Sequence, residues 1–257
     1  MKLDKTTTNN HTGNVLIYSH TKPDIGYVAR TTTQGQEFNM VRQYIRYLFT
    51  KYNKLRNKKA AIFIEPQLDT GYPDIVIVEY FSLPSTKWKE NRNHLSITDL
   101  KILYYIQTKR RGTIVEISNT LGYPLSLVEK SVLRLNEANL LHLSKSKKSV
   151  RNVPLNTYCR IHKIIAIEAK IDKWNEAIRQ ANNNIWFATE SYILLNKGSC
   201  SATVAEKCKA SGIGIILVNG KVRKVLPSAK RPFPVSYASL QFNEWLLRDI
   251  NRQEETV

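Results

Sequence analysis

The chain has few cysteines, and they are not spaced like the residues of a disulfide framework or a zinc site. Its 257 residues include three cysteines, Cys159, Cys200 and Cys208, an odd number without any CxxC pair. The five histidines are scattered, and no two of them have the spacing of metal ligands. We therefore expect the cysteines to be ordinary thiols.

Long apolar runs are also missing. No segment has the length and apolarity of a membrane span, and Met1–Lys5 begins a polar stretch without the apolar core of a signal peptide. We therefore expect a cytoplasmic protein that does not insert into a membrane.

Acidic residues are scarce relative to basic ones. The chain carries 39 Lys and Arg against 21 Asp and Glu, a formal net charge of +18. Such an excess favours a polyanionic partner over a small neutral substrate, and nucleic acid is the simplest polyanion. With 42% hydrophobic residues, the chain can bury one sizeable core or two smaller ones.

Two apolar runs carry acidic residues at their ends. Asp74 follows Pro73 and opens the run 75–78, and a second run, 164–167, leads into Glu168-Ala169-Lys170. Each run predicts a strand buried on both faces. Because side chains alternate along a strand, Glu168 and Lys170 should face the same side of the sheet. Carboxylates and a lysine fixed on strands are what metal-assisted phosphodiester cleavage requires.

The order Pro-Asp, strand, Glu-x-Lys resembles the PD-(D/E)xK nuclease superfamily. The resemblance implies an α/β fold, a mixed central sheet flanked by helices as in restriction endonucleases. It also implies that Asp74 and Glu168 bind Mg²⁺ or Mn²⁺, assisted by Glu65 and the carbonyl of Ala169, and that Lys170 orients or activates the attacking water.

Two accessory residues follow from the same resemblance. Glu37 lies at the start of a predicted helix with apolar residues at spacings of three and four, and Gln180 lies in the helix predicted over 174–182. Each of these two assignments has an argument against it. Glu37 suits the helix dipole and can serve as a cap, and the tyrosine that follows the glutamine in one subgroup is missing here.

A structural role is the alternative for the whole motif. Asp74 would then cap a turn after Pro73, and Glu168 and Lys170 would form an exposed cross-strand pair.

Roughly ninety residues separate Asp74 from Glu168, far more than an ordinary loop. The intervening sequence predicts three helices, the first capped by Ser96 or Thr98 and the third burying Val128, Val132 and Leu135. A basic stretch follows. This pattern, over Leu95–Val153, resembles the winged helix-turn-helix domains of bacterial regulators, with Asn139 in place of the usual glycine. We therefore predict a nuclease core, residues 1–83 and 159–257, interrupted by a mainly helical winged-helix domain, residues 84–158.

Basic and polar residues of the predicted insert lie where a winged helix meets DNA. The third helix would enter the major groove and the wing would contact phosphates, with Lys109, Arg110 and Arg111 adding to these contacts. The predicted DNA-binding residues are Ser126, Lys130, Arg134, Lys145, Lys147, Lys148 and Arg151. Solvated surface lysines are the alternative for each basic residue.

The second half of the predicted core alternates helices and strands. We expect a strand over 191–195, a helix over 203–210, a strand over 213–218, a turn at Asn219-Gly220 and a final helix around 242–250.

The sequence therefore predicts a Mg²⁺-dependent DNA endonuclease acting on double-stranded DNA, as a homodimer or as a subunit of a larger DNA-processing complex. The alternative is a non-catalytic winged-helix DNA-binding protein or regulator on a nuclease-like scaffold. An RNA-processing nuclease is a third, weaker hypothesis, because winged helices usually dock on duplex DNA.

Overall fold

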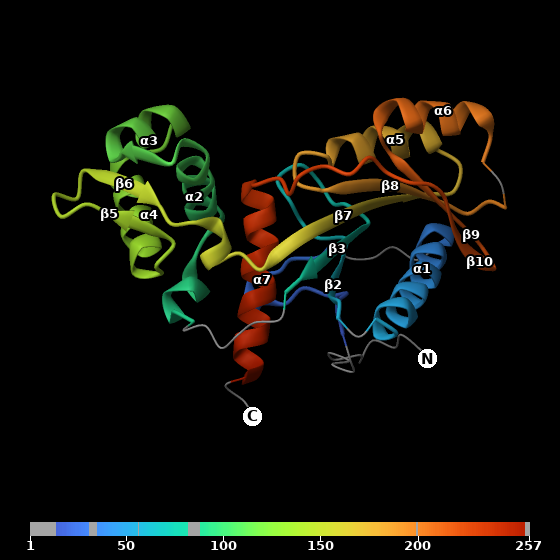
Figure 1. The fold of residues 1–257 in the computed structure, drawn as a ribbon, viewed down its shortest axis with the longest axis horizontal. Helices are drawn as coiled ribbons and strands as arrows, with labels where there is room; N and C mark the ends of the chain where they lie inside the picture. The colour runs from blue at the N-terminus through green and yellow to red at the C-terminus, as the bar shows by residue number, and fades with distance from the viewer. Residues whose placement is uncertain (1–13, 31–34, 56, 82–87, 199, 255–257) are drawn as a thin grey trace. The chain divides into compact units, whose positions relative to one another are not determined.

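The computed structural model describes residues 14–30, 35–55, 57–81, 88–198 and 200–254 (Figure 1). The strands are β1 (Val15–Tyr18), β2 (Lys59–Ile64), β3 (Ile75–Tyr80), β4 (Arg111–Thr113), β5 (Leu141–Leu143), β6 (Ser149–Asn152), β7 (Ile161–Lys170), β8 (Glu190–Leu195), β9 (Gly214–Asn219) and β10 (Lys221–Leu226). The α-helices are α1 (Gln36–Asn53), α2 (Ile97–Lys109), α3 (Ile114–Leu121), α4 (Leu125–Glu137), α5 (Trp174–Asn183), α6 (Ala202–Ser211) and α7 (Tyr237–Glu254). Short 3₁₀ helices are η1 (Pro23–Ile25), η2 (Glu90–His94) and η3 (Leu155–Thr157).

The protein is an α/β protein with a mixed sheet flanked by helices, as the sequence predicts at this level. The seven-stranded sheet has the order β1-β2-β3-β7-β8-β9-β10. Strand β3 is antiparallel to both of its neighbours, β2 and β7. Strands β7, β8 and β9 run parallel to one another. A small antiparallel sheet has the order β4-β6-β5.

The chain divides into two compact units. The first contains the described parts of residues 1–82 and 161–234, and the second those of residues 83–160 and 235–257. The predicted boundary at residues 83 and 84 falls on residues outside the described ranges. The whole segment 159–257 was predicted to belong to the first unit, but α7 belongs to the second.

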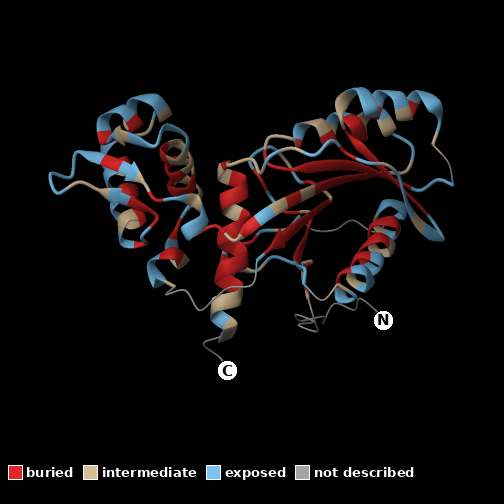
Figure 2. Cartoon of the chain, in the orientation of Figure 1, coloured by how far each residue is buried: buried red, intermediate tan, exposed pale blue. Residues whose placement is uncertain are grey.

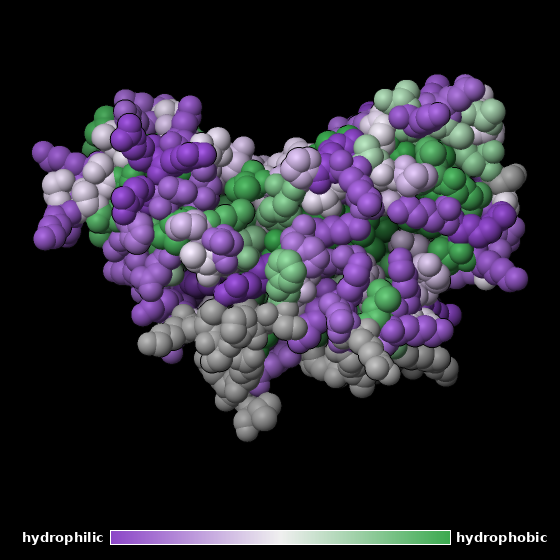
Figure 3. Space-filling view, in the orientation of Figure 1, coloured by the Kyte–Doolittle hydropathy of each residue, from purple (hydrophilic) through white to green (hydrophobic). Residues whose placement is uncertain are grey.

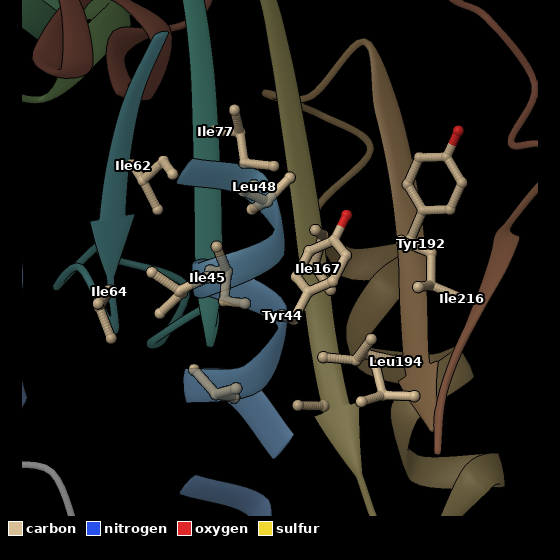
Figure 4. Close-up of a cluster of buried hydrophobic side chains, with 14 of the residues drawn as sticks. Tyr44, Ile45, Leu48, Ile62, Ile64, Ile77, Ile167, Tyr192, Leu194 and Ile216 are labelled. Atoms are coloured by element: carbon tan, nitrogen blue, oxygen red, sulfur yellow. The ribbon is translucent and has the colours of Figure 1, made fainter. Parts of the chain in front are cut away.

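The core of the first unit lies on both faces of the large sheet. Helix α1 covers one face, where Tyr44, Ile45 and Leu48 pack against Ile77 and Ile167 (Figure 4). Helices α5 and α6 cover the opposite face. Strand β3 is buried at every position, which explains why it is a continuous apolar run rather than an alternating one (Figure 2).

Local capping signals set the helix ends in the second unit. Ser96 begins α2 with a capping box completed by Asp99, and Thr113 begins α3 with a capping box completed by Glu116. Asn139, at φ 59°, adopts the left-handed conformation expected for the residue that ends a helix. Each cap satisfies backbone groups that the helix itself leaves unpaired.

Helix α7 is held within the second unit by buried charges. The Arg92 guanidinium contacts Glu244 at 2.7 Å, and Arg248 Nε donates to the Arg92 carbonyl at 3.1 Å. Asn243 Oδ1 accepts a 2.9 Å hydrogen bond from the Arg160 backbone N–H. Paired buried charges of this kind are costly to break, so they explain why the helix groups with residues 88–160.

A membrane-crossing helix would need a long apolar stretch, and none of the helices in the described ranges has one.

Candidate active site

The pairing of β3 with β7 brings the two predicted metal ligands together. Ile75 lies opposite Ile167 in this antiparallel pair, so the residues just before β3 meet those near the end of β7. Asp74 Oδ2 accepts a 2.7 Å hydrogen bond from the backbone N–H of Ala169, 95 residues along the chain. Glu168 directly precedes Ala169 on β7, so the two carboxyl groups lie close enough for the charge of Asp74 to act on Glu168.

Burial and mutual repulsion make these two carboxyl groups hard to ionise. Glu168 is only 3% exposed, and burial followed by the negative charge of Asp74 raises its pKa above the ordinary value. Burial likewise raises the pKa of Asp74, against the opposing effects of the Ala169 N–H and the Lys170 charge. A buried pair that resists ionisation is a site where a bound cation would relieve a large electrostatic cost.

Asn184, at the end of α5, holds Glu168 in place. Its side-chain amide donates a 2.6 Å hydrogen bond to Glu168 Oε1. Asn184 was not predicted from the sequence, because an asparagine after a helix carries no signal that it reaches a strand carboxylate.

Lys170 lies at the end of β7 next to Glu37 of α1. Its Nζ is 3.7 Å from Glu37 Oε2, and the backbone N–H of Ile171 donates to Glu37 Oε1 at 3.4 Å. Glu37 therefore contacts the end of the Glu-x-Lys strand besides occupying the first turn of its helix. The Lys170 side chain is 15% exposed, so its charge is partly shielded from water.

A cavity of about 320 Å³ opens at this end of the sheet. Asp74, Ala169, Lys170, Glu37 and Gln180 line it, whereas Glu168 does not. The side-chain carbonyl oxygen of Gln180 is buried and has no hydrogen-bond partner among the residues that the structure describes. Such an acceptor in the wall of a polar cavity needs a donor or a cation from outside the protein.

Glu65 is close to the site but is paired with another residue. It follows β2 at φ 46°, and its backbone N–H donates to the Asp74 carbonyl at 3.0 Å. Its carboxylate accepts a 3.0 Å hydrogen bond from Arg30 Nε, and Arg30 also lies 5.9 Å from the Tyr72 ring centre. Arg30 and Tyr72 line the cavity as well. Neither has a sequence signal, because both come from irregular segments.

The donor set fits a hard divalent cation with few protein ligands. In the described part of the chain, no three His, Cys, Asp or Glu side chains are grouped so that they could hold a metal ion. Mg²⁺ is commonly bound by one or two carboxylates, with water and substrate phosphates completing the shell. Asp74, Glu168 and the Gln180 oxygen are compatible with that type of site.

The residues predicted to bind DNA differ in how they are placed. Ser126 and Lys130 are exposed on α4. Arg134, on the same helix, instead forms a two-pronged contact with the fully buried Asp99, at 2.7 and 3.2 Å. Arg134 therefore ties α4 to α2.

The predicted wing residues are exposed. Lys145, Lys147 and Lys148 lie in the turn between β5 and β6, and Arg151 lies on β6. In register, Arg151 is directly opposite both Arg111 of β4 and His142 of β5. Arg111, His142 and Arg151 are exposed and line an open cavity of about 700 Å³. Hydrophilic side chains predominate in this region (Figure 3).

Comparison of the chain with protein-family models, with curated proteins and with solved structures finds no match.

Proposed function

We propose that the protein is a metal-dependent DNA endonuclease of the PD-(D/E)xK type, with Asp74, Glu168 and Lys170 at its catalytic centre. The observation that carries the proposal is the meeting of Asp74 with the Glu168-Ala169-Lys170 strand across 95 residues of sequence. A second support is the buried oxygen of Gln180, which has no partner among the described residues, in the wall of the same cavity.

Asp74 and Glu168 would hold Mg²⁺ or Mn²⁺, together with the Ala169 carbonyl or the Gln180 oxygen. Such an ion lowers the pKa of bound water and neutralises charge on the scissile phosphate. We propose that Glu65 is not a metal ligand and instead positions the Arg30 guanidinium beside the cavity, because its carboxylate is paired with Arg30.

Lys170 would act on the water or on the phosphate. Its ammonium group lies at the cavity wall, where a positive charge stabilises the negative charge that gathers on phosphate oxygens during attack. Glu37, at 3.7 Å, would fix the direction of the lysine side chain. In-line attack by water would leave a 5′-phosphate and a 3′-hydroxyl, as the resemblance implies.

The second unit would supply affinity for duplex DNA. Three helices, α2 to α4, followed by the β5–β6 hairpin are the order expected for the winged helix that the sequence resembles, which supports this part of the proposal. Lys130 and the exposed lysines of the β5–β6 turn would contact phosphates. Binding by one unit raises the effective concentration of DNA at the other.

Plasmid nicking with Mg²⁺ tests the catalytic assignment. We expect Asp74→Asn and Lys170→Met each to lower the nicking rate at least about 100-fold, because each removes a charge acting on the reacting phosphate. Asp172→Asn and Lys173→Met make the same charge changes at exposed positions nearby and should leave the rate unchanged. A chelator should abolish nicking by the wild type.

Equal nicking by all the variants would contradict the proposal. Binding of duplex DNA with or without Mg²⁺, with every phosphodiester left intact, would instead favour the non-catalytic DNA-binding protein.

A further inference from the structure

A second polar cavity lies in the first unit, at the opposite end of α1 from Glu37. It has a volume of about 200 Å³ and is enclosed by the C-terminal half of α1 and by strands β3 and β7 to β10. Four lysines line it: Lys51, Lys58, Lys163 and Lys224. Asp74 and Lys170 are not part of its wall, so the cavity is separate from the candidate active site.

Two buried glutamates neutralise only part of this positive charge. Glu190 contacts Lys163 Nζ at 2.7 Å and accepts a 2.6 Å hydrogen bond from the Tyr192 hydroxyl. Glu79 accepts a 2.7 Å hydrogen bond from the Tyr52 hydroxyl and lies 3.9 Å from Lys58. The lysines that line the cavity therefore exceed these two carboxylates by two positive charges.

Lys51 and Lys224 carry the excess. Lys224 Nζ is 3.8 Å from Glu190 and lies over the Tyr192 ring at 4.3 Å. Its pKa is lowered, first by burial and also by the positive charges of Lys163 and Lys51, although Glu190 opposes the shift. No carboxylate among the described residues lies within ion-pair distance of Lys51. Clustered ammonium groups repel one another unless an anion lies between them.

Tyr44 adds a hydrogen-bond donor inside the cavity. Its side chain is 5% exposed, and its hydroxyl makes no hydrogen bond to any residue that the structure describes. Figure 4 shows the Tyr44 and Tyr192 hydroxyls directed toward the same end of the sheet. The Tyr192 hydroxyl donates to Glu190, whereas the Tyr44 hydroxyl has no hydrogen-bond partner among the described residues, so it can donate to a ligand or to water in the cavity.

We propose that this cavity binds a small phosphate monoester, with the phosphate group held by Lys51, Lys163, Lys224 and the Tyr44 hydroxyl. A phosphate monoester carries close to two negative charges at neutral pH, which matches the excess of the cavity wall. Ammonium and hydroxyl donors are the groups that bind phosphate oxygens. The apolar wall, including Ile77 and Val222, can contact the organic part of the ligand. Binding here does not require nuclease activity.

Calorimetric titration of the full chain at low ionic strength tests the proposal, with inorganic phosphate, adenosine monophosphate and adenosine as probes. We expect the two phosphate-containing probes to bind and adenosine to bind far more weakly. Tyr44→Phe, Lys51→Met and Lys224→Met should each weaken binding at least about tenfold, which is about 1.4 kcal/mol, because each removes a hydrogen bond to a charged group.

Lys221→Met is the matched control, because it removes the same charge from the same strand as Lys224→Met, at a position that does not line the cavity. Asp74→Asn separates this cavity from the active site and should leave phosphate binding unchanged. Lys51 is exposed, so its variant should fold even if the Tyr44 variant does not.

Absence of phosphate binding by the wild type would overturn the proposal. So would equal affinities of the Lys51, Lys224 and Lys221 variants. A short DNA duplex is the remaining probe. If it displaces adenosine monophosphate from the wild type and does not bind Lys224→Met, the DNA backbone is the source of the phosphate. That result would overturn the assignment of a small ligand.

Discussion

At the scale of single residues, Asp74 and Glu168 make the folded protein less stable when they are ionised. Glu168 is buried and Asp74 is half-buried, and burial raises the pKa of each carboxyl group. A raised folded-state pKa means that the folded protein holds its proton at a pH where the unfolded chain has released it. The stability from that proton is complete below the unfolded pKa, about 4.3 for Glu, and is lost as pH rises through the folded pKa.

Glu168→Gln should therefore stabilise the metal-free protein at pH 8. The neutral amide keeps an acceptor for Asn184 and removes the repulsion with Asp74. We expect a melting temperature about 2–5 °C above that of the wild type in chelator, because about 1 kcal/mol shifts the melting point of a protein of this size by about 2–4 °C. The difference should shrink as pH falls toward 4.

Mg²⁺ should reverse the order of the two proteins. A ligand that binds only the folded state raises its melting temperature, so millimolar Mg²⁺ should stabilise the wild type and leave Glu168→Gln unchanged. The same melting temperature for both proteins at pH 8 in chelator, together with no response to Mg²⁺, would contradict the metal-site hypothesis.

At the scale of secondary-structure elements, Arg134 anchors α4 rather than presenting a charge to solvent. Burial alone would raise the pKa of Asp99, but hydrogen bonds from Arg134, Ser131 and Ser96 lower it below its ordinary value. The Asp99 carboxylate is also half of the capping box that begins α2. One ion pair thus joins the start of α2 to the C-terminal half of α4.

Arg134→Ala should lower the free energy of unfolding by about 1–3 kcal/mol, because it leaves a fully buried carboxylate with fewer partners. Lys130→Ala, one turn earlier on the same helix and exposed, should change stability by less than about 0.5 kcal/mol. Denaturant unfolding measures both. A loss of DNA affinity without a loss of stability in Arg134→Ala would show that Arg134 contacts DNA instead.

The elements that the sequence predicted are those with a clear apolar pattern. The 3.6-residue period predicted α1 and α4, and the continuous apolar runs predicted β3 and the core of β7. Strand β10 was missed, because it carries three basic residues and only the turn at Asn219-Gly220 indicates it. The partner of α7 was also missed, since Arg92 and Glu244 are 152 residues apart and no local pattern links them.

The same limit applies to the candidate site. The order of motifs predicted that Asp74, Glu168 and Lys170 belong together, and strand pairing brings the two segments side by side. Asn184 and Arg30 could not be predicted, because their contacts with Glu168 and Glu65 depend on the tertiary fold and follow from no local sequence pattern.

At the scale of the whole molecule, the net charge of +18 sets how the protein should respond to salt. A protein that neutralises phosphates with lysines releases condensed counterions, so its affinity for DNA falls as salt rises. The three exposed lysines between β5 and β6 concentrate charge in one turn, as expected for phosphate contacts rather than base recognition.

Replacing Lys145, Lys147 and Lys148 by Gln should weaken duplex binding and reduce the slope of log affinity against log salt by about two to three. The melting temperature should not change, because the turn is exposed. Replacing Lys197, Lys207 and Lys209 by Gln gives the same net charge at exposed positions of the first unit. Fluorescence anisotropy of a labelled duplex would measure both, and equal slopes would contradict a role for the turn.

The segments of the two compact units alternate along the chain. The first unit needs residues 161–234, which follow residues 83–160 of the second unit, and the second unit needs residues 235–257. During translation, strand β3 is made long before β7 can pair with it, and the buried Arg92 guanidinium has no carboxylate until the segment carrying Glu244 has been made. A cleavage centre built from Asp74 and Lys170 could therefore not assemble on a nascent chain that stops within the insert. Truncated products that end before β7 would therefore lack Glu168 and Lys170, and with them half of the candidate centre.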